Sequence, residues 1–135
     1  EKWRDVMDAL NYLRDEVGMN IVLLAHSQVV KFDPPGLPGF NRYAPRLRFK
    51  TVNIIYDHMD AVGFINYRTE IKEEKGGFGK SNNHAQGGGT RYIHFEERPA
   101  FYAKNRYGFG DDVMVMPGQT VAKLAKKAPI AGLSV

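Results

Sequence analysis

The apolar positions near the N-terminus recur at helical spacing. Residues 2–17 carry them three or four positions apart, with charged residues between them: Trp3, Val6, Met7, Leu10, Leu13 and Val17. This spacing predicts an amphipathic helix. Gly18 stands where such a helix would end, because glycine tolerates the left-handed backbone found at helix C-termini.

A continuous apolar run, NIVLLA, follows at residues 20–25. Its length and its β-branched residues predict a strand buried on both faces, as in a parallel sheet. His26, Ser27 and Gln28 come directly after it. Ligands of open α/β sheets bind beyond the carboxyl ends of the strands, so this junction is a candidate site.

The rest of the chain alternates between irregular and regular patterns. Residues 29–46 contain four prolines and two glycines, which predicts an irregular stretch. Beyond them we expect a helix at about 47–58 and a strand at 60–67, which residues 68–75 extend or turn into a hairpin. A flexible tip at 76–89 should follow, and then strands at 90–95 and 99–103, the second ending at Lys104. After Pro117 we expect a helical or disordered tail.

This order of elements predicts an α/β fold in which a parallel sheet is continued by an antiparallel hairpin. Residues 1–117 would form the folded portion, and residues 118–135 the tail.

Composition narrows the class of protein. The chain has 135 residues, 43% hydrophobic and 25% charged, which is ordinary for a globular protein. It has no run of eighteen apolar residues, so no membrane-spanning helix is expected. It has no cysteine, which excludes disulfides and thiolate metal sites. The net charge of +4 permits nucleic-acid binding without requiring it.

A glycine-rich segment partly matches a phosphate-binding loop. Gly79, Lys80 and Ser81 supply the end of the pattern, but Glu74 occupies its first position, where a carboxylate would repel phosphates. The segment NNHAQGGG that follows is also a poor start for the required helix. We therefore favour a mobile hairpin tip.

Gln28 is a candidate sensor of a terminal phosphate. Its amide can donate to a phosphate oxygen and accept from an attacking water. A polar junction without a ligand is the alternative, and position alone does not separate the two.

The stretch after Gln28 is basic and aromatic. Its cations, accompanied by a single acid, Asp33, are Lys31, Arg42, Arg46, Arg48 and Lys50, and its interleaved aromatic residues are Phe32, Phe40, Tyr43 and Phe49. Cations neutralise phosphates and aromatic rings stack on unpaired bases, so this stretch is a candidate single-strand binding element. A solvated loop with some aromatic residues packed on the core is the alternative.

Lys104 and Arg106 form a second candidate site. Side chains two residues apart on an extended segment point the same way, so both cations could reach one phosphate chain. The alternative is a solvated turn relaxed by Gly108. Asp60 and the Glu96–Glu97 pair lack further ligands at supporting spacing, and the four histidines are scattered, so no metal site is predicted.

Several of these segments together resemble a known group. The segments LLAHSQ, DAVGFINY, GFGK with the following GGG and Arg, and EERPAFYAKNRYG are similar to those of phage AAA-type nucleotide-binding proteins, which are RecA-like P-loop ATPases of recombination and single-strand annealing. The likeness runs from about Trp3 to Pro117. The KNRYG element also resembles the KNRFG motif of RadA and the lysine/arginine element of DnaB-type helicases.

The resemblance implies roles for these residues. Gln28, Lys104 and Arg106 would be catalytic, and Ser27 would join them in nucleotide binding, with Lys104 and Arg106 reaching the ATP of a neighbouring subunit in a ring or filament. The DNA-binding residues would be Lys31, Arg42, Tyr43, Arg46, Arg48 and Lys50. The full-length protein would use ATP and Mg²⁺, act on single-stranded DNA, contact no membrane and work in the cytoplasm of a bacterial host.

One departure from the family limits these roles. The phosphate-binding loop and the metal-supporting aspartate strand of such ATPases lie upstream of the region that matches here. We therefore expect the chain to be the C-terminal part of the core, inactive alone and needing the upstream half. We favour a fragment, because Glu1 falls inside a helical pattern; a separate partner chain or lost activity are the other options. The alternative function is a non-catalytic module for single-stranded nucleic-acid binding or assembly.

Overall fold

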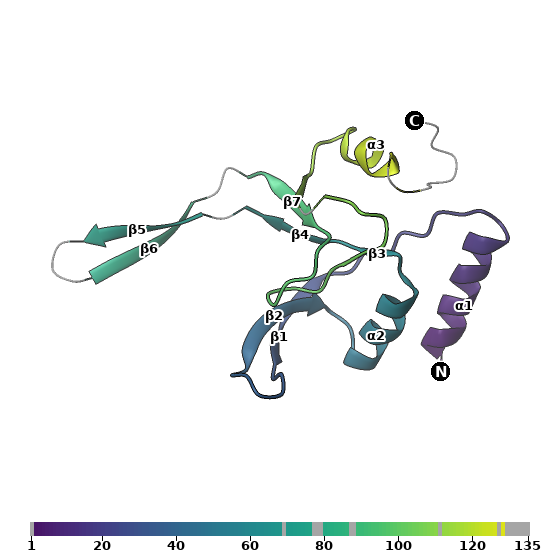
Figure 1. Ribbon diagram of the computed structural model, residues 1–135, viewed down its shortest axis with the longest axis horizontal. Helices are drawn as coiled ribbons and strands as arrows, with labels where there is room; N and C mark the ends of the chain where they lie inside the picture. The colour runs from purple at the N-terminus through teal and green to yellow at the C-terminus, as the bar shows by residue number, and fades with distance from the viewer. Residues whose placement is uncertain are drawn as a thin grey trace.

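The computed structural model describes residues 2–68, 70–76, 80–86, 89–110, 112–126 and 128. Among these residues are three helices and nine strands (Figure 1). Their bounds are α1 Lys2–Asp15, β1 Ser27–Phe32, β2 Phe40–Pro45, α2 Phe49–His58, β3 Ala61–Val62, β4 Phe64–Tyr67, β5 Glu70–Gly76, β6 Lys80–Gln86, β7 Arg91–His94, β8 Lys104–Asn105, β9 Asp112–Met114 and α3 Thr120–Ala125.

The expected N-terminal helix is confirmed as α1, and it ends at Asp15. Gly18 has φ of 75°, the left-handed conformation predicted for the helix end. The backbone N–H of Met19 donates to the carbonyl of Leu13 at 3.0 Å, which closes the last turn. Met7 is fully buried, while the rest of the helix is largely exposed.

The predicted buried strand at residues 20–25 is wrong. These residues have no regular structure, and Val22 and Leu24 are 77% and 92% exposed. A strand buried on both faces requires neighbouring strands at its edges and helices over its faces. Among the described residues none takes these places, so the apolar run lies open.

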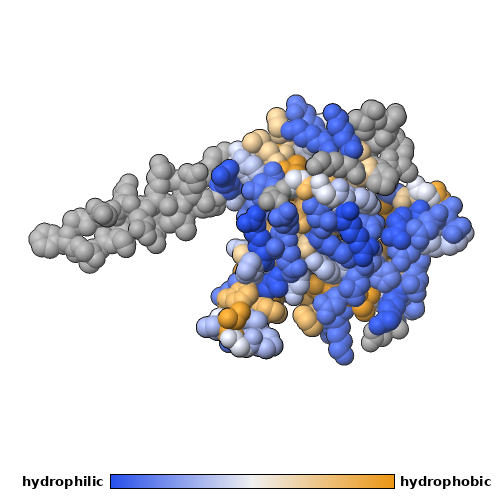
Figure 2. All heavy atoms as spheres, in the orientation of Figure 1, coloured by the Kyte–Doolittle hydropathy of each residue, from blue (hydrophilic) through white to orange (hydrophobic). Residues whose placement is uncertain are grey.

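The prediction of an irregular stretch at residues 29–46 is also wrong. Strands β1 and β2 pair antiparallel there, with Gln28 opposite Ala44 and Val30 opposite Arg42. Three of the prolines lie in the connection between the strands, where they do not interrupt the ladder, and Pro45 is the last residue of β2. Figure 2 shows apolar side chains at the surface of this hairpin. Val29 and Leu37, which belong to it, are exposed.

The second helix is confirmed as α2, which begins two residues after the expected position. Its Thr51 and Val52 are buried. The amide of Asn11 on α1 lies 2.8 Å from Nδ1 of His58, so a side-chain hydrogen bond joins the two helices.

The expected strand at 60–67 is confirmed, but Gly63 divides it into β3 and β4. A Cβ at this position would lie 2.6 Å from Cγ2 of Ile93 and 3.0 Å from Cε1 of Phe95, so only glycine fits. Strand β3 pairs with β8, whereas β4 joins a sheet of order β4-β7-β9. Because of this break, residues 61–67 contribute strands to two different sheets.

The β5–β6 hairpin confirms that residues 68–75 begin a hairpin, but the flexible tip at 76–89 is wrong in part. Residues 80–86 form β6, which pairs antiparallel with β5. The hairpin extends away from the rest of the molecule (Figure 1). Lys80 and Ser81 open a strand, not a helix, which agrees with the rejection of a phosphate-binding loop. Residues 77–79 and 87–88 lie outside the described residues.

The strand predicted at 99–103 is wrong, whereas the strand expected at 90–95 is confirmed as β7. Residues 98–101 make a turn in which the N–H of Phe101 donates to the carbonyl of Arg98 at 3.1 Å. The next strand, β8, contains Lys104 itself. The turn is fixed from another element, since the N–H of Tyr43 donates to the carbonyl of Ala100 at 2.7 Å.

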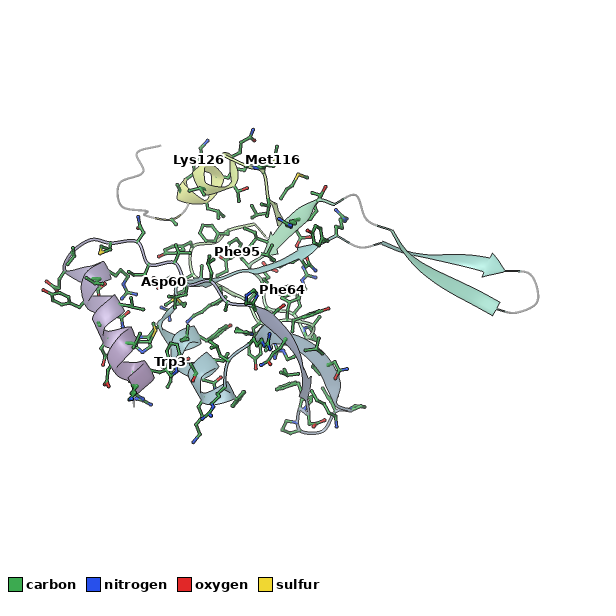
Figure 3. All side chains as sticks on the ribbon, turned by 180° about the vertical axis from the view of Figure 1, so that it is seen from behind. Trp3, Asp60, Phe64, Phe95, Met116 and Lys126 are labelled. Carbon is green, nitrogen blue, oxygen red and sulfur yellow. The ribbon has the colours of Figure 1, made fainter. Side chains whose placement is uncertain are left out.

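The C-terminal segment is helical at α3, and residues 127 and 129–135 of the predicted tail lie outside the described residues. Phe95, Phe109 and Ala128 form a buried cluster, and Leu124 of α3 packs against it. Phe95 lies between the central strands and α3 (Figure 3). Helix α3 is thus part of the packed body.

The fold is mixed α/β with small antiparallel sheets. The expected parallel sheet is not present among the described residues: all their strand ladders are antiparallel, and the one parallel pairing is an isolated bridge between Tyr43 and Phe101.

Candidate functional site

Lys104 lies on β8, where it reaches the end of α2. Its Nζ donates to the carbonyl of Tyr56 at 2.7 Å and to that of Asp57 at 3.2 Å. It also lies 5.1 Å from the centroid of the Tyr56 ring. A cation at a helix C-terminus is favoured by the helix dipole and satisfies carbonyls that have no partner inside the helix. Partial burial lowers the pKa of Lys104, and the neighbouring Arg106 cation lowers it further.

Arg106 comes two residues later and is held by Asp60. Its Nη1 donates to Oδ1 of Asp60 at 3.1 Å, and its backbone N–H donates to the carbonyl of Asp60 at 3.0 Å. The Arg106 side chain remains 56% exposed. Arg106 is close enough to Lys104 for charge repulsion to lower the pKa of Lys104.

Asp60 is contacted by side chains from two parts of the chain, the segment after β8 and helix α1. Besides Arg106, the hydroxyl of Tyr107 donates to its Oδ2 at 3.2 Å, and Nη1 of Arg14 on α1 lies 3.8 Å from Oδ2. Figure 3 places Asp60 between α1 and the central strands. Burial raises the pKa of Tyr107, and the Asp60 carboxylate raises it further. From the sequence, Asp60 was considered only as a metal ligand, because nothing in its spacing showed that it would meet Arg14 and Arg106.

Ser27 and Gln28 open the β1–β2 hairpin, in a sheet separate from that of Lys104. Ser27 is exposed and pairs with Pro45. The side-chain amide of half-buried Gln28 donates to the carbonyls of Pro45 and Leu47 at 3.3 and 3.4 Å. Gln28 therefore ties the base of the hairpin to the segment that leads into α2.

Arg42 lies inside the protein, unlike the other candidate DNA-binding residues. Only 7% of it is exposed. Its Nη2 donates to Oε1 of Glu97 at 2.9 Å, and its guanidinium carbon lies 3.8 Å from the ring centroid of Tyr102. Its Nε is buried without a hydrogen-bond partner. The guanidinium is thus committed to the core and does not face a ligand from solvent.

The remaining candidates lie at the surface. Lys31 is exposed and 3.2 Å from Asp33, and Tyr43 is 44% exposed with its ring stacked on Phe64 at 5.1 Å. Figure 3 shows Phe64 near the base of the hairpin. The other three cations, exposed around the start of α2, are Arg46, Arg48 and Lys50.

A polar cluster around His94 was not predicted from the sequence. Nδ1 of His94 lies 2.5 Å from Oδ1 of Asp112, and its Nε2 lies 2.7 Å from Oδ1 of Asn66. These residues line a hollow of about 250 Å³ together with Tyr67, Arg68 and Tyr92. The members come from separate strands, so no local motif could have revealed them. Among the described residues no group of three or more metal-ligating side chains is found.

Comparison with protein families gives the chain a class. A family model described as an AAA domain matches residues 1–107. The chain belongs to this AAA domain family. The match includes Gln28 and extends through Lys104, Arg106 and Tyr107. As an AAA domain, the chain is a module of nucleotide-binding, ATPase type.

No curated protein and no solved structure matches the chain. No helix among the described residues of this AAA domain is long and apolar enough to cross a membrane.

The residues of this AAA domain fit part of a nucleotide site. Lys104 and Arg106 are cations of the kind that bind phosphate oxygens. The described residues contain no strand-to-helix phosphate-binding loop, and Lys80 begins a strand. Among the described residues the fit therefore consists of these two cations, without a loop that cradles phosphates. ATP, when bound, supplies the transferable phosphoryl group, and Mg²⁺ neutralises its charge.

Proposed function

We propose that this chain is the responsive part of a RecA-like ATPase that serves phage DNA recombination or single-strand annealing. In this proposal Lys104 and Arg106 act on the nucleotide of a neighbouring protomer in a ring or filament. Gln28, next to Ser27, senses the terminal phosphate in its own protomer, and the β1–β2 hairpin contacts single-stranded DNA.

The observation that carries the proposal is a pair of cations, Lys104 on β8 and Arg106 just after it. Arg106 is half exposed, Lys104 lies beside it, and both fall within the segment matched by the AAA domain family. A guanidinium and an ammonium that reach a transferring phosphoryl group stabilise its developing charge. The exposure of the Arg106 guanidinium supports action across an interface between protomers.

The contacts of Gln28 support a coupling role. Its amide donates to Pro45 and Leu47, which are the last residue of the hairpin and a residue before α2. A ligand that drew this amide away would release the base of the hairpin from α2. Occupancy of a nucleotide site could thus change the hairpin that we propose meets DNA.

The DNA-binding part of the proposal rests on the exposed residues. Lys31, Arg46, Arg48 and Lys50 can approach phosphates, and the half-exposed ring of Tyr43 can stack on a base. Arg42 is left out, because its guanidinium is buried against Glu97 and Tyr102.

The upstream half of the same core is the partner that we propose for residues 20–25. This apolar run is exposed and forms no strand, although its composition is that of a strand in a parallel sheet. A second half that brought neighbouring strands would bury Val22 and Leu24 and would also bring the phosphate-binding loop.

Alanine substitution of Lys104 and Arg106 in the complete ATPase tests the proposal. We expect K104A and R106A each to lower single-strand-stimulated ATP turnover by about 10³-fold, since cations in this role contribute on that order. Nucleotide binding, measured with a fluorescent ATP analogue, should change little. Lys123→Ala, an exposed cation on α3 outside the family match, is the control. Normal turnover in R106A would refute the role across the interface.

A non-catalytic single-strand-binding or assembly module is the second candidate. The exposed cations at the start of α2 favour it, because they need no catalytic partner. It predicts that this chain alone binds an oligonucleotide and that added salt weakens the binding steeply. If the chain does not bind at low salt, this candidate fails.

A further inference from the structure

Asp60 holds Arg106 through two contacts of different kinds. The side chains form an ion pair at 3.1 Å, and the backbone N–H of Arg106 donates to the Asp60 carbonyl at 3.0 Å. The backbone hydrogen bond fixes the position of the Arg106 main chain. The ion pair determines where its guanidinium points.

The carboxylate of Asp60 would not be left alone if Arg106 moved away. Tyr107 donates to Oδ2 at 3.2 Å, and the Arg14 guanidinium lies 3.8 Å from the same oxygen. Breaking an ion pair is costly mainly when it leaves a buried charge without a partner. Here the arginine is half exposed and the carboxylate keeps two partners, so the exchange costs only what a surface pair costs.

Lys104 has no comparable freedom. Its Nζ donates to two carbonyls at the end of α2 and lies over the Tyr56 ring. Leaving this position would strip both carbonyls of their donor. Of these two cations, Arg106 is therefore the one that changes its partner at the smaller cost.

We propose that Asp60 is a positioning residue that holds Arg106 on its own chain until a phosphate group displaces the carboxylate. The proposal rests on the role of Arg106 across the protomer interface. Carboxylate and phosphate oxygens fit the same guanidinium N–H groups, so they compete for them. A triphosphate bound by a neighbouring protomer carries more negative charge than Asp60. When it is close enough, it therefore replaces the Asp60 carboxylate as the partner of the Arg106 guanidinium.

Titration of this chain with inorganic tripolyphosphate tests the exchange directly. The Arg106 guanidinium is followed by NMR in wild type and in D60N. Removing the competing carboxylate charge should tighten the apparent binding about two- to five-fold, the range expected for an exposed pair. Asp8→Asn is the matched control, because it removes an exposed carboxylate from α1 that contacts neither Asp60 nor Arg106. D8N should behave as wild type.

A second variant should change the affinity for tripolyphosphate in the opposite direction. Tyr107→Phe removes one of the donors that share Asp60, so the carboxylate holds Arg106 more strongly and tripolyphosphate should bind more weakly. This variant keeps the test decisive if D60N does not fold. Equal affinity in wild type, D60N and Y107F would overturn the proposal.

The complete ATPase separates this inference from the proposed function. D60N should reach half-maximal turnover at a protein concentration about two- to five-fold lower, with unchanged turnover at saturation. If R106A loses turnover but D60N matches wild type, the holding role of Asp60 fails and the role across the interface stands. If R106A keeps normal turnover, the proposed function itself fails.

Discussion

Arg42 and Arg106 each pair with a carboxylate, and their surroundings are opposite. Arg42 is 7% exposed, 2.9 Å from Glu97 and stacked against Tyr102. Arg106 is 56% exposed and 3.1 Å from Asp60. The distances are similar, but the first guanidinium cannot leave without unpacking the core, whereas the second can meet a ligand from solvent. Burial, rather than the ion pair itself, separates a structural arginine from a candidate functional one.

Truncating each arginine should give the largest contrast in stability. Arg42→Ala removes a buried side chain with its ring contact and its hydrogen bond, so the free energy of unfolding should fall by about 2–3 kcal/mol. Arg106→Ala should cost less than about 0.5 kcal/mol, because its pair is exposed. Denaturant unfolding followed by circular dichroism measures both. Equal losses would show that burial does not make Arg42 contribute more to stability than Arg106.

Salt should affect the two ion pairs unequally. A double-mutant cycle on Arg106 and Asp60 should give a coupling of about 0.5 kcal/mol at low salt and close to zero at about 1 M salt. The Arg42–Glu97 coupling should be about 1–2 kcal/mol and should change little, since the guanidinium is shielded from ions. The contrast fails if salt removes both couplings alike.

The smallest expected effect concerns Tyr107 at alkaline pH. Burial raises its pKa in the folded state, with a further rise from Asp60. A raised pKa contributes stability that is present below the unfolded value, near pH 10, and is lost as pH rises through the folded value. Tyr107→Phe should therefore flatten the fall in stability above about pH 10. Unfolding curves across this range check it, and an unchanged slope would contradict the assigned cause.

Sequence patterns predicted the local elements of the fold well where one face alone is packed. The helix at α1, the helix at α2 and the strand at β7 follow from their own periodicity. The pattern failed at residues 20–25, because an apolar run indicates burial only when other elements arrive to cover it. It failed at the β1–β2 hairpin for another reason: prolines in the connection concealed two short alternating strands.

The candidate site was predictable only residue by residue. Lys104, Arg106 and Gln28 were proposed as site residues from the sequence, and Arg42 was grouped with the surface cations beside it although it is buried. The partners Asp60, Glu97 and Tyr56 lie about forty or more positions away from the side chains they contact, and no spacing rule connects them.

The sequence by itself determined the chemical inventory of this AAA domain: its helices, its basic and aromatic stretch, and the two cations of the KNRYG element. The tertiary structure decided which of those cations are available. Charge and spacing are local properties of the chain, but exposure depends on which distant side chains pack nearby. For that reason Arg42 is enclosed by Tyr102 and Glu97, while Arg106 remains within reach of solvent.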